Sequence, residues 1–250
     1  MMIAPLLLCL CLQDVSGLIV QLDDASVEKR EKAEAGLIAA GKSAIDALRK
    51  ASSEGSAEVQ VRSRRALRAI KTRLQMWEFD PGETAKKALP EFVVPEGKLL
   101  FRTLSEKKHE SISRFLPAFR LIVMEYASGT AQRSRLAAVD IDGTVTPLDN
   151  VGHHDKWIGS MRKWFVGASI HAPTREDAQS VVNLWMALLD DHRNFGQWWG
   201  GSQIEEANDN GRKASATWTH GKSCSWTDAF AFRFDTAGIL VDLTHTEIQH

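Results

Sequence analysis

Two aspartates separated by one residue are the side chains whose types and spacing most directly suggest chemistry. Asp140 and Asp142 stand in the segment AAVDIDGTVT, residues 137–146, where an apolar run ends at the first aspartate. Two acids at this spacing, at the end of a strand, are what a carboxylate nucleophile with a charge-neutralising metal ion requires. The same residues also predict a turn, because Asp-Gly between two alternating runs is a strong signal for a β-hairpin.

The segment resembles the first motif of haloacid-dehalogenase-type phosphatases, an apolar strand that ends in Asp-x-Asp-Gly-Thr. The resemblance implies that Asp140 is the nucleophile, that Asp142 is the general acid/base, and that a magnesium ion joins them. Lys163 would then serve as the family's lysine. That motif normally opens its domain, however, and the later acidic pair of the family follows an apolar strand, whereas Asp190 and Asp191 end an amphipathic stretch. We therefore favour the hairpin and keep the phosphatase as an alternative hypothesis.

Histidines are scattered over the second half of the chain. His153, His154 and Asp155 are consecutive, but neighbouring side chains of a strand point to opposite faces, and a zinc-binding helix would carry histidines at i and i+4. We therefore expect no metal site and no cofactor. The remaining histidines are interpreted as surface or capping residues: His171, His192, His220, His245 and His250.

Trp198, Trp199, Gly200 and Gly201 follow neither a helical nor a strand period. Two exposed tryptophans would form an aromatic platform for a sugar or a peptide. The competing interpretation is a plug at the end of the hydrophobic core, with glycines that allow close approach. We favour the plug because the region from Trp157 to Trp226 holds seven tryptophans, and we keep a small-ligand or glycan-binding module as a second functional hypothesis.

Other catalytic signatures are absent from the sequence. It contains no phosphate-binding glycine loop, no Gly-x-Ser-x-Gly motif, no His-Glu-x-x-His helix and no dinucleotide fingerprint. The chain is 44% apolar and 25% charged, which is typical of a globular protein, and its net charge of −1 gives no reason to expect a nucleic-acid partner. We expect a protein without catalytic residues.

The first twelve residues contain the uncharged run Leu6–Leu12. This run is shorter than the roughly 20 residues that a transmembrane helix needs, and it fits the apolar core of a secretory signal peptide. We expect residues 1–12 to be removed and the protein to be exported to the periplasm or beyond, with at most peripheral membrane association. The alternative is a buried apolar element at an intact N-terminus. Removal of Cys9 and Cys11 would leave Cys224 as a lone thiol that forms no intrachain disulfide.

Aromatic residues divide the chain at Trp77. All ten Phe, all eight Trp and the single Tyr lie at or after this position, whereas residues 1–76 have a helix-forming composition. Residues 77–98 carry three prolines among charged residues, which is typical of a connecting segment. The sequence therefore predicts a helical domain over 13–76, a linker over 77–98 and a tryptophan-rich domain over 99–250.

Three helices are predicted in the first domain from apolar periodicity and from glycine stop signals. They cover residues 26–40, 43–51 and about 57–75, and Gly41 ends the first of them. The first and third match at an offset of thirty residues, as Leu37 with Leu67, which indicates an internal repeat.

The stretches LIVQLDDASVEKREKAEAGLIAAGKSAIDALRKA and AEVQVRSRRALRAI resemble HEAT-type helical repeats over about residues 17–75. The resemblance implies a packing and protein-interaction module. About three such repeats are usually needed for stability, so a shorter segment is expected to pack against the second domain, a second copy or another protein. The third helix is basic, which we interpret as a solvated face with packed arginine stems, with an acidic partner surface as the alternative: Arg62, Arg64, Arg65, Arg68, Lys71 and Arg73.

Strand patterns and turn signals alternate in the second domain. They indicate a three-stranded meander that is duplicated at an offset of about 92 to 95 residues, with turns at 142–143 and 235–238. The predicted strands cover residues 121–124, 137–141, 144–148, 214–218, 230–234 and 239–243.

The clearest helix of the chain is predicted to begin at Thr174, with Asp177 completing a capping box. Its apolar stripe from Ala178 to Leu189 requires a sheet to cover, and no equally clear helix stands about 92 residues earlier. The predicted fold class is therefore a two-domain α+β protein. A short HEAT-like helical segment is followed by an α+β domain with an antiparallel sheet and one long amphipathic helix.

The leading functional hypothesis is an exported, non-enzymatic protein whose helical-repeat segment serves protein–protein interaction or intramolecular docking. The alternatives are the ligand or glycan module at the tryptophan-rich segment and the phosphatase at Asp140 and Asp142.

Overall fold

The computed structural model describes residues 14–89, 98–103, 110–128, 131–148, 154–193, 199–205, 208, 210–219 and 226–249. The chain divides into two compact units, Met1–Met76 and Trp77–His250. The predicted signal peptide over residues 1–12 and all three cysteines lie outside the described residues. Among the helices that are described, none is long and apolar enough to cross a membrane.

Unit 1 is helical, and its two long helices begin at serine caps thirty positions apart. Ser26 Oγ accepts a hydrogen bond from the Lys29 amide at 3.5 Å, and Ser56 Oγ accepts one from the Val59 amide at 3.3 Å. Gly41, with φ of +64°, ends the first of these helices as expected. The helices are α1 Val15–Gln21, which the sequence did not predict, α2 Val27–Ala40, the short 3-10 turn Gly41–Ala44, α3 Ile45–Glu54 and α4 Ala57–Leu74.

Unit 2 contains two four-stranded antiparallel sheets within the described residues, with strand orders β1-β2-β3-β4 and β5-β6-β7-β8. The strands are β1 Lys98–Thr103, β2 Phe119–Ser128, β3 Ala131–Asp140, β4 Val145–Pro147, β5 Trp199–Ile204, β6 Arg212–Thr219, β7 Trp226–Phe234 and β8 Leu240–Gln249. The mixed, strand-rich unit behind a helical one confirms the predicted α+β class.

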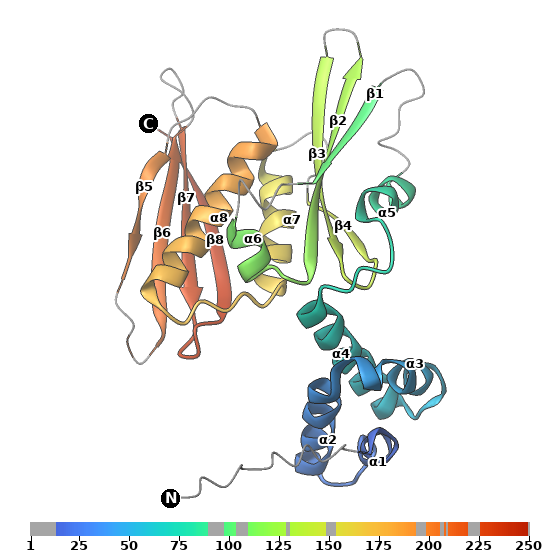
Figure 1. Cartoon of the computed structure of the whole chain (residues 1–250). Coiled ribbons are helices and arrows are strands. Elements are labelled where there is room, and N and C mark those ends of the chain that lie inside the picture. The colour runs from blue at the N-terminus through green and yellow to red at the C-terminus, as the bar shows by residue number, and fades with distance from the viewer. Residues whose placement is uncertain are drawn as a thin grey trace, which may run out of the picture. The chain divides into compact units, whose positions relative to one another are not determined.

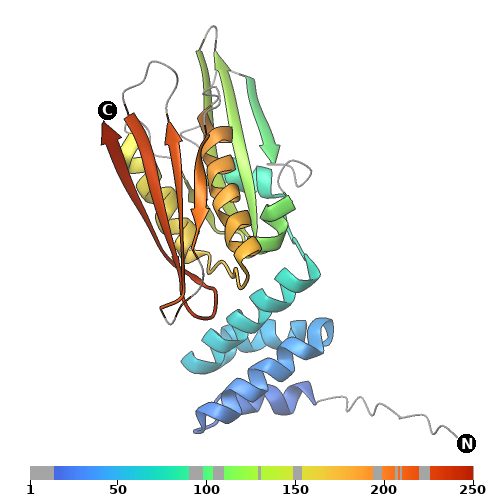
Figure 2. The same ribbon diagram turned by 90° about the vertical axis from the view of Figure 1, so that its left-hand side faces the viewer.

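Three helices of unit 2 fill the layer between the sheets, and a fourth covers the outer face of the first sheet (Figures 1 and 2). The inner helices are α6 Glu110–Phe115, α7 His154–Gly167 and α8 Arg175–Arg193, and the outer one is α5 Pro81–Ala88. The predicted stripe of α8 is buried, and Trp185 at its centre packs 5.2 Å from Phe165 and 5.6 Å from Phe230, measured between ring centroids.

The predicted linker over residues 77–98 is wrong for its first half. Asp80 caps α5 through the Glu83 amide, and Ala85 and Leu89 are buried against Ile122 and neighbouring residues of β2 and β3. Proline at the first position of a helix is favourable, so Pro81 starts this helix rather than interrupting one. Residues 90–97 lie outside the described residues.

Both predicted meanders are present, and each sheet has one strand more than the sequence indicated, β1 and β5. A helix also stands before each sheet: α5 before β1, and α8 before β5. No helix as clear as the one over 174–190 was visible at this place in the sequence, because α5 is short and buries only Ala85 within its own span, which leaves no periodic apolar stripe to recognise.

Candidate functional site

Asp140 and Asp142 lie at the tight turn between the antiparallel strands β3 and β4. Asp140 Oδ1 accepts hydrogen bonds from the amides of Asp142 at 2.9 Å and Thr144 at 3.0 Å. Gly143, with φ of +87°, completes the turn. A carboxylate that binds its own turn serves the chain reversal, so the geometry favours the hairpin interpretation over a nucleophile at the end of a parallel strand.

The turn between β7 and β8 repeats this geometry without a second acid. Asp235 Oδ1 accepts from the amides of Ala237 at 2.9 Å and Ile239 at 2.8 Å, and Gly238 has φ of +82°. The Asp-x-x-Gly pattern is therefore the turn chemistry of a duplicated meander. This repetition removes the specific reason to assign chemistry to the first copy.

The tryptophan-rich segment is partly a strand. β5 begins at Trp199 and contains Gly200 and Gly201, and its register against β6 shifts between Trp199 and Ser202. A bulge of this kind disrupts the two-residue alternation, which explains why no strand period was visible. Trp198 and the tryptophan side chain at 199 lie outside what the structure describes.

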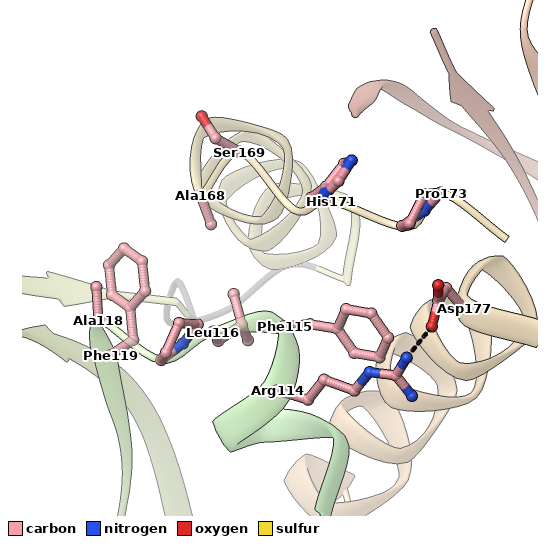
Figure 3. Close-up of a pocket in the computed structure, with 11 residues that line it drawn as sticks. Arg114, Phe115, Leu116, Ala118, Phe119, Ala168, Ser169, His171, Pro173 and Asp177 are labelled. Atoms are coloured by element: carbon pink, nitrogen blue, oxygen red, sulfur yellow. Dashed lines mark hydrogen bonds and ion pairs between the residues drawn. The ribbon is translucent and has the colours of Figure 1, made fainter. Parts of the chain in front are cut away.

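A cavity of about 410 Å³ lies at one end of the helical layer of unit 2, and Figure 3 draws the residues that line it. This volume falls within the usual range for small-molecule sites, roughly 300–1,000 Å³. One rim is the segment 114–119, which ends α6 and enters β2, and the other is the α7–α8 connection together with Asp177 of α8. Its lining combines a run of apolar residues over 115–119 with polar and charged residues on the other rim and at 114: Arg114, Phe115, Leu116, Pro117, Ala118, Phe119, Ala168, Ser169, His171, Pro173 and Asp177.

The α7–α8 connection is held in place by the turn between β7 and β8. The Ala172 amide donates to the Gly238 carbonyl at 2.7 Å, and the Leu240 amide donates to the Ile170 carbonyl at 2.9 Å. His171 Nε2 lies 2.8 Å from the Ala237 carbonyl oxygen. Because a carbonyl only accepts, this ring nitrogen carries the hydrogen. The rim of the cavity that the α7–α8 connection forms is thus held in place by the protein itself.

Arg114 and Asp177 join the two sides of the cavity by an ion pair (Figure 3). The Asp177 side chain is 5% exposed, whereas the Arg114 side chain is 63% exposed. The Arg114 guanidinium also lies 5.1 Å from the centroid of the Phe115 ring, a cation–π distance. Arg114 is therefore the charged group that the cavity presents to solvent.

Asp177 also accepts hydrogen bonds within the cap of α8. Its Oδ2 accepts from the Thr174 amide at 3.3 Å and from Thr174 Oγ1 at 2.9 Å, while the Asp177 amide donates to Thr174 Oγ1 at 3.1 Å. The predicted capping box is confirmed. The cavity thus combines an exposed donor, Arg114, with a buried acceptor, Asp177, that already binds Arg114 and Thr174.

Ser169, His171 and Asp177 have the residue types of a hydrolytic triad, but their hydrogen bonds run elsewhere. His171 binds a backbone carbonyl, and Asp177 binds Thr174 and Arg114. A triad requires the base to hold the nucleophile and the acid to hold the base. This arrangement suits binding rather than nucleophilic catalysis.

A second, more open cavity of about 770 Å³ lies between α8 and β5. Gln179 crosses it, donating from Nε2 to Ser202 Oγ at 2.7 Å. Its lining is almost entirely polar: Arg175, Glu176, Gln179, Ser180, Ser202, Gln203, Ile204 and Glu205. Ile204 is the one residue of this lining with a purely apolar side chain.

One histidine interpreted as a surface or capping residue is instead buried beside a carboxylate. His245 Nε2 lies 2.6 Å from Asp228 Oδ1, and the two side chains are 10% and 0% exposed. The imidazole stacks on Phe230 at 5.1 Å between centroids. The register of β7 against β8 brings the two residues together. Asp228 lies opposite Glu247, so His245, two residues before Glu247 on the same face of the sheet, is its diagonal neighbour.

The other chemistry-bearing residues do not come together in the described part of the chain. His154 begins α7 and His192 lies near the end of α8, but their side chains, like that of Asp155, are outside the description. His153, His220 and His250 also fall outside it. Among the residues that are described, no group of three or more His, Cys, Asp or Glu is placed to hold a metal ion.

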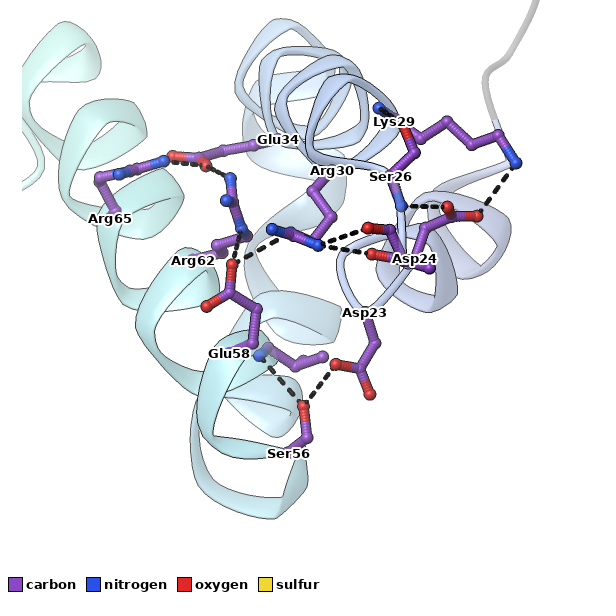
Figure 4. A network of polar contacts seen from close by, with 12 residues as sticks. Asp23, Asp24, Ser26, Lys29, Arg30, Glu34, Ser56, Glu58, Arg62 and Arg65 are labelled. Carbon is purple, nitrogen blue, oxygen red and sulfur yellow. Dashed lines mark hydrogen bonds and ion pairs between the residues drawn. The ribbon is translucent and has the colours of Figure 1, made fainter.

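Unit 1 carries a polar network between α2 and α4 (Figure 4). Glu34, 8% exposed, accepts from Arg62 at 3.0 Å and also from Arg65. Glu58 accepts from Arg62 Nε at 2.6 Å, and this hydrogen bond lowers the pKa of Glu58 and raises that of Arg62. The hydrogen bond to Glu34 likewise raises the pKa of Arg65.

The basic residues of α4 are thus engaged within unit 1. Arg64 donates to the Ser52 carbonyl at 3.2 Å, and Arg73 donates to the Ile38 carbonyl at 2.7 Å. These contacts favour the interpretation of packed arginine stems over an acidic partner surface, because the guanidinium groups are already bound.

Comparisons with known proteins give no relative. No protein-family model matches the chain, and neither the curated proteins nor the solved structures contain a match to it.

Proposed function

We propose that the chain is a binding protein whose unit 2 holds a small molecule in the cavity between 114–119 and 168–177. The observation that carries the proposal is one cavity whose lining includes an exposed guanidinium, an imidazole held by a backbone carbonyl and the partly exposed ring of Phe119. Small-molecule sites combine an apolar lining with a few convergent polar groups in this way.

The connection opposite Arg114 contains a residue in a costly conformation. Ser169 has φ of +54°, a left-handed conformation that favours glycine at a helix end. The flanking hydrogen bonds of Ile170 and Ala172 hold it there. Backbone strain of this kind, about 1–3 kcal/mol, persists where the surroundings over-determine the conformation, and it is common at ligand sites.

A fragment screen by thermal unfolding tests the proposal. Ligands of the cavity raise the unfolding midpoint, with a stabilisation of about 2.7 kcal/mol when the ligand is at 100 times its Kd. Ala168→Phe fills the cavity and abolishes these shifts, whereas Ala231→Phe, on the exposed face of β7, leaves them unchanged. Shifts that survive Ala168→Phe would place binding elsewhere and refute the proposal.

A second candidate function is interaction through unit 1, which the exposure of its aliphatic side chains favours. Val20 is 75% exposed, Val61 57% and Val27 54%. We propose a second copy as the partner, because helical repeats stack on neighbours of their own kind. Analytical ultracentrifugation of the full chain should show a dimer, and the double variant Val20→Ser, Val61→Ser should weaken it. A wild-type chain that stays monomeric over a hundredfold range of concentration would contradict the proposal.

Export is proposed on residues 1–12 alone. Mass spectrometry of the protein recovered from its producing cell tests the proposal, and a mature chain that lacks about the first twelve residues is expected. An intact Met1 in the exported fraction, or a protein found wholly in the cytoplasm, would refute it.

A further inference from the structure

We infer that the ligand of the cavity between 114–119 and 168–177 is a small organic carboxylate with a flat or branched apolar body. The inference rests on the proposed binding function and specifies the chemical class of its ligand.

The donors and acceptors of the cavity differ in availability. A guanidinium has five N–H donors, and within the described residues Asp177 is the acceptor that Arg114 contacts. The carboxylate of Asp177 is 5% exposed and is occupied by Arg114 and Thr174. A ligand therefore meets an exposed, charged donor, while the one carboxylate beside it is buried and already bound by the protein, and the complementary group is an anionic acceptor.

The shape of the anion follows from the geometry of the guanidinium. Its planar fork matches a carboxylate through two parallel N–H···O bonds. Phosphate would satisfy the same fork, but the partly exposed apolar side chains of Pro117, Phe119 and Ala168 favour a ligand whose single charged end is small beside its apolar body.

The alternative is that Arg114 acts only as a tether that holds α6 to the start of α8. The two roles are separable at Asp177. If Arg114 is only a tether, Asp177→Asn and Arg114→Gln break the same contact and have the same effect on binding. If Arg114 binds the ligand, Asp177→Asn removes a competing carboxylate and leaves binding intact or strengthens it.

The test measures, on the full chain, the Kd of paired probes by calorimetry: benzoate and benzamide, phenylacetate and phenylacetamide, 4-methylpentanoate and 4-methylpentanamide. At least one carboxylate should bind about tenfold to a hundredfold more tightly than its amide, the difference expected of a charge-assisted hydrogen bond. Arg114→Gln should abolish this preference, Arg114→Lys should restore part of it, and Arg233→Gln, at an exposed position of β7, should not change it.

The outcomes distinguish failure of the carboxylate inference from failure of the proposed binding function. If amides bind as tightly as carboxylates in the wild type, and Ala168→Phe abolishes both, the cavity is a ligand site and the carboxylate inference is wrong. If Asp177→Asn loses binding to the same degree as Arg114→Gln, with both variants folded by circular dichroism, Arg114 is a tether and the inference is again wrong. If neither the screen nor any probe detects a ligand that Ala168→Phe excludes, the proposed function itself fails.

Discussion

Arg62 Nη1 lies 3.0 Å from Glu34 Oε2, although twenty-eight positions separate the two residues in the chain. The contact joins the middle of α4 to the middle of α2, and both side chains are almost fully buried, at 11% and 8% exposure. A buried carboxylate between helices stays ionised only if it is paired and hydrogen-bonded. The pair therefore ties one face of α2 to one face of α4.

Glu34→Gln tests this relationship. The substitution keeps the size of the side chain but leaves Arg62 and Arg65 without their shared anion, and we expect unfolding to become easier by about 1–3 kcal/mol. Urea unfolding measures the change. Glu31→Gln, on the exposed side of α2, serves as the control and should shift the midpoint little; equal effects of the two changes would show that burial of Glu34 does not matter.

The pKa of Glu58 predicts how unit 1 responds to acid. The hydrogen bond from Arg62 lowers the pKa of Glu58 below its usual value of 4.5 in the folded state. A lowered carboxyl pKa gives stability that is complete above the unfolded-state pKa and is lost as the pH falls through the folded-state pKa. Glu58→Gln should therefore destabilise unit 1 at pH 7, and its difference from the wild type should shrink as the pH is lowered below about 4.5. A difference that stays constant from pH 7 to pH 3 would contradict the assignment.

Gly238 shows how tightly the rim of the cavity is built. Its φ is +82°, and a Cβ added there would lie 2.7 Å from Pro173 Cα and 2.8 Å from the Ala172 carbonyl oxygen. We expect Gly238→Ala to destabilise unit 2 by about 1–3 kcal/mol because of strain and this clash. Gly159→Ala is the matched control: Gly159 lies within α7 with nothing within 4 Å of the added Cβ, so the change should be neutral or stabilising by up to about 1 kcal/mol. Chemical denaturation monitored by tryptophan fluorescence distinguishes the two.

The Asp228–His245 pair predicts a cost for removing either partner. Asp228 is completely buried, and Asp228→Ala leaves the His245 ring without its acceptor, so a loss of about 2–4 kcal/mol is expected. A double-mutant cycle with His245→Phe, which keeps the stacking on Phe230, isolates the pairwise term. Additive effects of the two substitutions would mean that the pair contributes no coupling.

Several elements could be predicted because their signals are local. Ser26, Ser56 and Thr174 bind amides three residues further on, which a sequence pattern reveals directly. The alternation of Phe230, Phe232 and Phe234 and the Asp-x-x-Gly turns fixed β7, β8 and the hairpin at Asp140 for the same reason. Each of these features depends on residues within a few positions of one another.

The elements that were missed lack such signals. α5 spans eight residues, and the packing of Ala85 and Leu89 against a distant sheet, rather than an amphipathic period, stabilises it. α7 buries Ile158, Met161 and Phe165, but glycines at 159 and 167 interrupt its pattern. Burial against other parts of the unit overrides such weak local preferences.

The amino-acid sequence by itself determined the helical first unit, the antiparallel hairpins of the second and the α+β class, because caps, turns and apolar periods act over short distances along the chain. Only the tertiary structure decided where chemistry is concentrated. Arg114 and Asp177 are sixty-three positions apart, and they meet because α6 and α8 are packed between the same two sheets, an outcome of core burial that no local pattern encodes.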